Sequence, residues 1–225
     1  MSNNLTTARL SLAASIVTLL TLAVLHILSP EFAPSWRMVS EYANGNYSWV
    51  LSLMFTFWAI SSWILALAIW SEVKTTAGKV GLYFLIASGV GEAMAAVFDI
   101  NHSLHGLASL IGIGALPIAA MLISTSLGRT DVWSAAKKSL LVTANLTWIS
   151  VLLMGITFAI LITTFTQAGG DMTSTEVPTS LPDGVIAWVG WTNRFLIVAY
   201  CVWVITVAWQ AIIIDRFEQT YENHE

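Results

Sequence analysis

The sequence predicts an all-α integral membrane protein, a bundle of about six transmembrane helices with both termini in the cytoplasm. Three observations lead to this fold class. Hydrophobic residues make up 56% of the 225 residues and charged residues only 10%, whereas a soluble domain carries about 25% charged residues. Six apolar stretches reach the roughly 20 residues that a helical span needs. The Lys and Arg residues gather mostly on one side of these stretches.

The composition also excludes several classes of protein. With so few charged side chains, a soluble globule of this size could not cover its surface, so a soluble enzyme is excluded, as are a disordered and a fibrous chain. The net charge is −4 and no basic run is present, so membrane lipids are expected as partners and nucleic acid is not. Cys201 is the only cysteine, so no disulfide can form within the chain.

The six predicted helices belong to a single domain, residues 1–225. Each apolar run is continuous rather than alternating, and only helices or closed barrels satisfy the backbone in lipid, so the runs are helices. The first run is too long for the apolar core of a signal peptide, and it is expected to remain as an anchor. The spans are expected near residues 8–28, 47–70, 79–98, 104–127, 139–165 and 185–214.

The basic residues predict the orientation. One side of the predicted bundle carries Arg9, Lys74, Lys79, Arg129, Lys137, Lys138 and Arg216. The other side carries only Arg37 and Arg194. Basic residues favour the cytoplasmic side of a membrane, so both termini are expected there. Segments 30–46 and 167–182 then form the long outer loops.

Most of the unusual polar side chains fall on the predicted outer side. They come from the first outer loop, the turn between the third and fourth spans, and the start of the last span. Because this topology brings the three segments to one membrane surface, we expect an outward-facing polar pocket that binds a small polar or lipid headgroup ligand. The predicted ligand-binding residues are Glu41, Glu92, Asp99, Asn193 and Arg194.

Glu92 is unusual because it lies inside the third span. It precedes Asp99 by seven residues, which places both on one helix face. Gly81, Ser88 and Ala95 lie near the same stripe, and small residues let helices approach closely. We therefore expect Glu92 to face the bundle interior. It is either a protonated side chain hydrogen-bonded between helices or part of a ligand, metal or proton site.

His102 and His105 open the fourth span three residues apart, so they share a face. Together with Asp99 they could ligate a divalent metal such as zinc. The alternative is that Asp99 and Asn101 cap the helix while the histidines hydrogen-bond at the membrane interface. A haem held by His26 and one of this pair is a further alternative.

The two outer arginines also allow two interpretations. In the first, Arg194 pairs with an acidic residue inside the bundle, such as Glu92 or Asp99. In the second, Arg37 or Arg194 clamps a phosphate or carboxylate, since the planar guanidinium suits bidentate binding.

Four runs of the sequence resemble the prokaryotic membrane family known as domain of unknown function 998. These runs are PSWRMVSEYANG, VGEAMAAVFDINHSLHG, ALPIAA and WTNRFLIVAY. The resemblance covers most of the chain and implies a multi-pass protein of the bacterial cytoplasmic membrane. It implies no activity.

A more distant similarity, in ingredients alone, is to the membrane hydrolases of the alkaline-ceramidase and adiponectin-receptor kind, which use a Ser, an Asp and three His around zinc. One alternative function is therefore that of a metal-dependent hydrolase acting on a lipid. Another is that of a structural membrane subunit.

Overall fold

The computed structural model describes residues 3–171 and 180–222, and all regular structure within them is helical. Among these residues, six helices are long and apolar enough to cross a membrane, which confirms the predicted all-α bundle of about six transmembrane helices. They are α1 (Asn3–Leu28), α2 (Ser48–Ala68), α3 (Thr76–Val97), α4 (His105–Leu127), α5 (Lys137–Gln167) and α6 (Val189–Glu222). Two 3-10 helices, η1 (Val39–Asn44) and η2 (Asp131–Ala136), lie in the connections.

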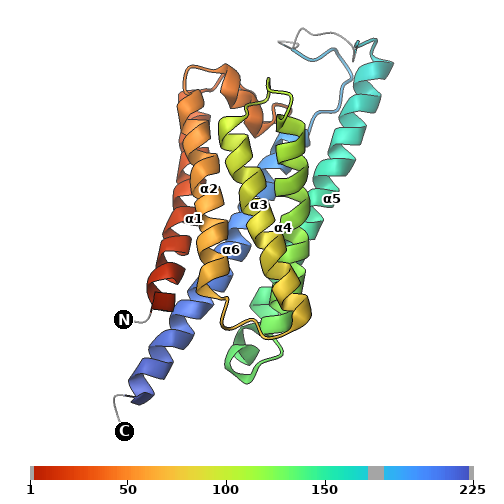
Figure 1. Cartoon of the computed structure of the whole chain (residues 1–225). Helices are drawn as coiled ribbons and strands as arrows, with labels where there is room; N and C mark the ends of the chain where they lie inside the picture. The colour runs from red at the N-terminus through yellow and green to blue at the C-terminus, as the bar shows by residue number, and fades with distance from the viewer. Residues whose placement is uncertain (1–2, 172–179, 223–225) are drawn as a thin grey trace.

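Both termini lie at one end of the bundle (Figure 1). We call the opposite end, which carries the α1–α2 connection and the α3–α4 turn, the outer end. The predicted span boundaries differ most at α6, which begins at Val189 rather than near 185 and ends at Glu222 rather than near 214. Gly184, in the turn that precedes it, adopts a positive φ of 85°. Residues 172–179 of the predicted outer loop lie outside the described residues.

A hydrogen bond next to Pro117 joins α4 to α6 in the middle of the bundle. Pro117 lies inside α4 and has no N–H, so the carbonyl of Ile113 loses its helical donor. The Tyr200 hydroxyl of α6 donates to that carbonyl at 2.6 Å. A buried backbone acceptor is thereby satisfied by the neighbouring helix.

Glycines allow α3 and α4 to cross at very short range. A Cβ added at Gly91 would lie 2.3 Å from the amide nitrogen of Gly112 and 2.7 Å from the carbonyl of Ala108. No residue other than glycine fits at this position without moving the backbone. The contact fixes the depth and direction of the next residue, Glu92.

Helix α5 is packed along only half of its length. Its buried residues all lie in the first half, and they are Leu140, Thr143, Ala144, Thr147 and Ser150. No residue from 151 to 167 is buried in the structure, and Figure 1 shows the outer end of α5 leaning away from the other helices. Val151 and Met154 are partly buried against the core, so the loosely packed part of α5 lies beyond Met154.

The orientation of the bundle can be tested with single cysteines in a Cys201→Ala background. Ser103 in the α3–α4 turn and Ser134 on η2 are both exposed, at opposite ends. Because basic residues favour the cytoplasmic side, we expect a membrane-impermeant maleimide to label Ser103→Cys in intact cells. It should label Ser134→Cys only after the membrane is opened, and the reverse pattern would overturn the assigned orientation.

Candidate functional site

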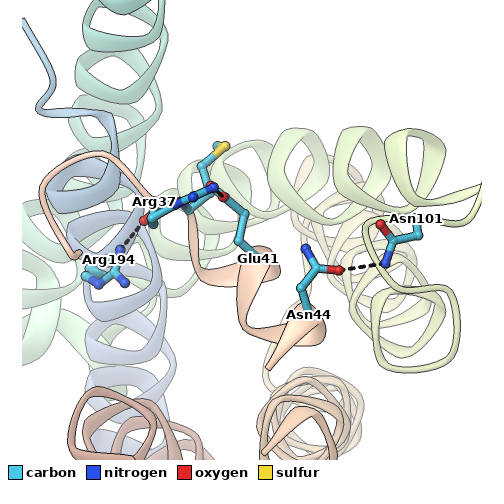
Figure 2. Close-up of polar contacts among 6 residues, drawn as sticks. Arg37, Glu41, Asn44, Asn101 and Arg194 are labelled. Carbon is cyan, nitrogen blue, oxygen red and sulfur yellow. Dashed lines mark hydrogen bonds and ion pairs between the residues drawn. The ribbon is translucent and has the colours of Figure 1, made fainter. Parts of the chain in front are cut away.

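Arg194 lies near the start of α6 and ties together three parts of the outer end. Its side chain is buried, with 5% exposed. Nη1 donates to the carbonyls of Arg37, at 2.7 Å, and Gly190, at 3.0 Å. Nη2 donates to the Tyr42 hydroxyl at 3.0 Å, and Nε donates to Nε2 of His26 at 2.6 Å. We call Arg194 and four groups that accept its hydrogen bonds, on His26, Arg37, Tyr42 and Gly190, the arginine clamp. Figure 2 shows the bond to the carbonyl of Arg37.

The prediction that Arg194 has an acidic partner is wrong. Within the described part of the chain, no carboxylate lies within ion-pair distance of its guanidinium. The outer ion pair instead joins Arg37 to Glu41 at 2.7 Å. Carbonyl dipoles, a hydroxyl and an imidazole compensate the buried charge of Arg194, and the face of the Tyr42 ring lies 5.5 Å from its guanidinium carbon.

His26 uses both ring nitrogens within this clamp. Its Nδ1 lies 2.7 Å from the carbonyl of Leu22, which can only accept, so Nδ1 carries the proton. Its Nε2 accepts from Arg194. We infer the neutral Nδ1–H tautomer from these partners. Neither nitrogen is left to bind iron, so the haem alternative does not fit the geometry.

The clamp and its neighbour Asn193 hold the α1–α2 connection over the bundle. The backbone N–H of Val39 donates to Oδ1 of Asn193 at 2.9 Å, and Gly190 donates to the carbonyl of Ser35 at 2.9 Å. A Cβ at Gly190 would lie 2.4 Å from the carbonyl of Pro34, so a larger residue would push the loop away. We call residues 34–44 the roof.

Within the roof, Glu41 has structural partners. Its Oε2 accepts from Arg37, and its Oε1 accepts from the backbone N–H of Met38 at 2.7 Å. The roof also bonds to the α3–α4 turn, because Nδ2 of Asn101 donates to Oδ1 of Asn44 at 2.9 Å (Figure 2). The roof is thus held at both edges.

Beneath the roof is a cavity of about 210 Å³, the inner cavity. Its walls are mostly apolar and include Met38, Val39, Phe55, Trp58, Ala95, Ile100, Ala108, Ile113, Leu196 and Ile197. Five polar side chains also line it, and they are Ser40, Glu92, His105, Ser109 and Asn193. The structure therefore brings together three of the predicted site residues, Glu92, His105 and Asn193.

Glu92 is 3% exposed and sits in a chain of hydroxyl contacts. Its Oε2 accepts from Ser62 at 2.9 Å, and its Oε1 lies 3.0 Å from Oγ of Ser88. Ser88 Oγ also lies 2.9 Å from the carbonyl of Gly112. One hydroxyl has one proton and cannot donate to two acceptors. If Glu92 is protonated, it donates to Ser88, Ser88 donates to Gly112, and every contact is a hydrogen bond.

Several polar side chains that line the inner cavity have atoms without hydrogen-bond partners among the described residues. Nδ1 of His105 donates to the carbonyl of Phe98 at 2.9 Å, which leaves Nε2 unused. In the described residues, the hydroxyls of Ser40 and Ser109 make no hydrogen bond. The buried Nε1 of Trp58 also has no partner there. Unpaired donors and acceptors beside an apolar space are typical of a ligand site.

Asp99 and His102 lie outside this cavity, exposed on the α3–α4 turn. Oδ1 of Asp99 accepts from the Asn101 backbone at 2.9 Å, and Nδ1 of His102 accepts from the Leu104 backbone at 3.1 Å. The described residues contain no group of three His, Cys, Asp or Glu side chains placed to hold a metal ion. The structure therefore does not bring Asp99, His102 and His105 together as zinc ligands.

A second cavity of about 370 Å³, the outer cavity, lies beside the first. The two share Met38 and Ile100 in their walls. The outer cavity has a polar and charged side formed by Trp36, Arg37, Glu41, Asn44 and Asn101. Its apolar side includes Phe158 and Leu161, from the loosely packed half of α5.

Tyr42, Ser62 and Trp58 were not predicted as site residues. Tyr42 directly follows Glu41, a predicted ligand-binding residue, in the run PSWRMVSEYANG, and this position was the available signal. Ser62 and Trp58 lie in an apolar span where serine and tryptophan are unremarkable, so the sequence holds no comparable signal for them.

Comparison with known proteins places this chain in a family. A family model described as "Protein of unknown function (DUF998)" matches residues 12–210. The match covers most of the chain, so the chain belongs to this family, and the resemblance in its sequence is confirmed. No curated protein and no solved structure matches this chain.

The arginine clamp should contribute strongly to stability. Arg194→Lys keeps the charge but cannot reach three segments at once, and it leaves buried acceptors unpaired. We expect a loss of about 2–4 kcal/mol, measured as a lower melting temperature in detergent. The matched control is Arg129→Lys, at an exposed position. Equal melting of Arg194→Lys and the parent would show that the clamp is not needed.

Glu92 should behave as a neutral hydrogen-bonding group. Glu92→Gln can donate to Ser88 and accept from Ser62, so we expect it to stay within about 1 kcal/mol of the parent. Glu92→Ala should lose about 2–3 kcal/mol, because it removes both bonds and leaves a void. The infrared spectrum of the parent should show the C=O band of a protonated carboxylic acid. The spectrum of Glu92→Gln should lack this band, so the difference between the two spectra reveals it. Absence of that band in the parent would contradict the neutral form.

Proposed function

We propose that this member of the family binds an amphiphilic molecule from the outer leaflet of the membrane, with the apolar part of the molecule in the inner cavity. The observation that carries the proposal is the pairing of two neighbouring cavities of different character. The inner cavity is mostly apolar, and the outer cavity has a polar and charged side.

The size of the cavities supports this function. An engineered apolar cavity of about 150 Å³ in another protein binds benzene. The inner cavity, at about 210 Å³, is larger and has room for a ring or a short stretch of alkyl chain. The outer cavity, at about 370 Å³, lies in the size range of small-molecule sites. Together they suit a molecule with an apolar part and a polar part.

The packing of α5 supports access from the side. Phe158 and Leu161 form a wall of the outer cavity, and the part of α5 that carries them has no buried residue. Thr157 is hydrogen-bonded to Thr192 at 2.7 Å, which ties α5 to α6 just below these residues. A small outward movement of α5 above Thr157 would open the outer cavity to the surrounding lipid.

The polar residues then divide into two roles. Glu92, His105, Ser109 and Asn193 line the inner cavity and are proposed to face the ligand. Glu41 is proposed to face the polar part of the ligand from the outer cavity. Arg194 is proposed to act indirectly, because its hydrogen bonds position the roof. The hydrolase alternative would need a metal centre, and no observation in the described residues favours one.

The proposal can be tested by filling the inner cavity. Ala95 lines it, whereas Val97, on the same helix, is 76% exposed. We expect Ala95→Phe to abolish photolabelling of the cavity by an alkyl amphiphile that carries a diazirine, because the ring occupies the space of the chain. Val97→Phe should label like the parent. Peptide mapping by mass spectrometry provides the measurement, with a melting curve for each variant as the check on folding.

Equal labelling of Ala95→Phe and the parent would show that the amphiphile does not use this cavity.

A further inference from the structure

We propose that the inner cavity selects an uncharged ligand group that carries a hydroxyl or carbonyl oxygen, bound by Ser109 and His105 beside Glu92. This inference rests on the proposed function and names the class of ligand. It is carried by the charges around the cavity and by the unpaired polar atoms on its wall.

An anionic group would find no opposite charge in the inner cavity. None of the described residues that line it is Lys or Arg. Arg37 borders the outer cavity instead, and Arg194 is held by acceptors of the roof, α1 and α6. An anion that leaves water for an apolar site without a counter-charge loses a large hydration free energy, so carboxylates and phosphates are disfavoured here.

A cationic group is disfavoured for a different reason. Glu92 is the one acidic side chain among the described residues of the cavity wall. Its contacts with Ser62 and Ser88 are all satisfied when it is protonated. To pair with a cation it would have to ionise, and Ser88 would then face two acceptors, Glu92 and the carbonyl of Gly112, with a single proton.

A neutral oxygen group fits the atoms that remain. His105 and Ser109 are four residues apart on α4, so they lie one above the other on the same face. With Nδ1 of His105 donating to the carbonyl of Phe98, Nε2 can accept a hydrogen bond from a ligand hydroxyl. The Ser109 hydroxyl can donate to a hydroxyl or carbonyl oxygen, and the buried N–H of Trp58, also in the cavity wall, lacks a partner among the described residues.

The unpaired atoms also explain selectivity against a plain hydrocarbon. A site built to hydrogen-bond an oxygen rejects an analogue that lacks it, because the buried polar groups of the site are then left without partners. The apolar walls, from Phe55, Ala95, Ala108 and Ile197, would bind the carbon frame of either molecule equally. The oxygen therefore decides the preference.

The test compares four photoprobes with the same polar head group and the same diazirine-bearing alkyl chain, whose far end carries a hydroxyl, a carboxylate, a trimethylammonium or a methyl group. The full-length protein is placed in nanodiscs of phosphatidylcholine, whose surface has no net charge, and labelled peptides are quantified. We expect the alcohol to label the cavity about tenfold more than each of the others. Ser109→Ala should reduce labelling by the alcohol about fivefold. The control is Ser103→Ala, an exposed serine on the α3–α4 turn.

The outcomes separate this inference from the proposed function. Cavity labelling that is equal for all four probes, or strongest for a charged probe, overturns the neutral-oxygen inference and leaves amphiphile binding in place. Loss of the alcohol preference in Ser109→Ala with full labelling in Ser103→Ala supports the inference. An unchanged preference in Ser109→Ala overturns the role of Ser109. If no probe labels the cavity at all, the proposed function itself fails.

Discussion

The outer end of this protein is organised around one buried cation. A charged side chain within a membrane protein is costly unless its environment compensates it, and Arg194 is compensated by acceptors from the roof, from α1 and from its own helix α6. Each acceptor also depends on the arginine, because without it a carbonyl, a hydroxyl and a ring nitrogen would be buried without a donor. The arginine therefore joins the roof, α1 and α6, and it acts with the bonds from Asn193, Gly190 and Asn101 that also hold the roof over the inner cavity.

The second feature that shapes the site is the close crossing of α3 and α4. The glycine contact at Gly91 directs Glu92 toward the bundle, where its carboxyl group contacts the hydroxyls of Ser62 and Ser88. The bundle thus places a polar side chain, satisfied by these contacts, beside a mostly apolar cavity. Because no residue of α5 beyond Ser150 is buried, the proposed entry of a ligand from the lipid is compatible with this architecture.

The sequence predicted the six helices because hydropathy and length alone decide whether a segment crosses a membrane. Topology decides which helix ends meet, and of the polar residues predicted to converge at the outer side, Glu92, His105 and Asn193 line the inner cavity. The sequence could not predict the partners of Arg194, because backbone carbonyls occur at every residue and only the folded loop selects which of them face the guanidinium. The exposure of Asp99 and His102 depends on the conformation of a short turn, which the sequence leaves open. The role of Ser62 depends on the rotation of α2 about its own axis.

The most direct test of this account is residue-level hydrogen exchange of the protein in nanodiscs, with Arg194→Lys compared with the parent. The parent should protect the amides of Val39 and Gly190, which are bonded to Asn193 and Ser35. We expect Arg194→Lys to lose that protection while amides in the inner halves of α2 and α3 keep theirs. Unchanged protection at Val39 and Gly190 in Arg194→Lys would contradict the claim that this arginine holds the roof over the cavity.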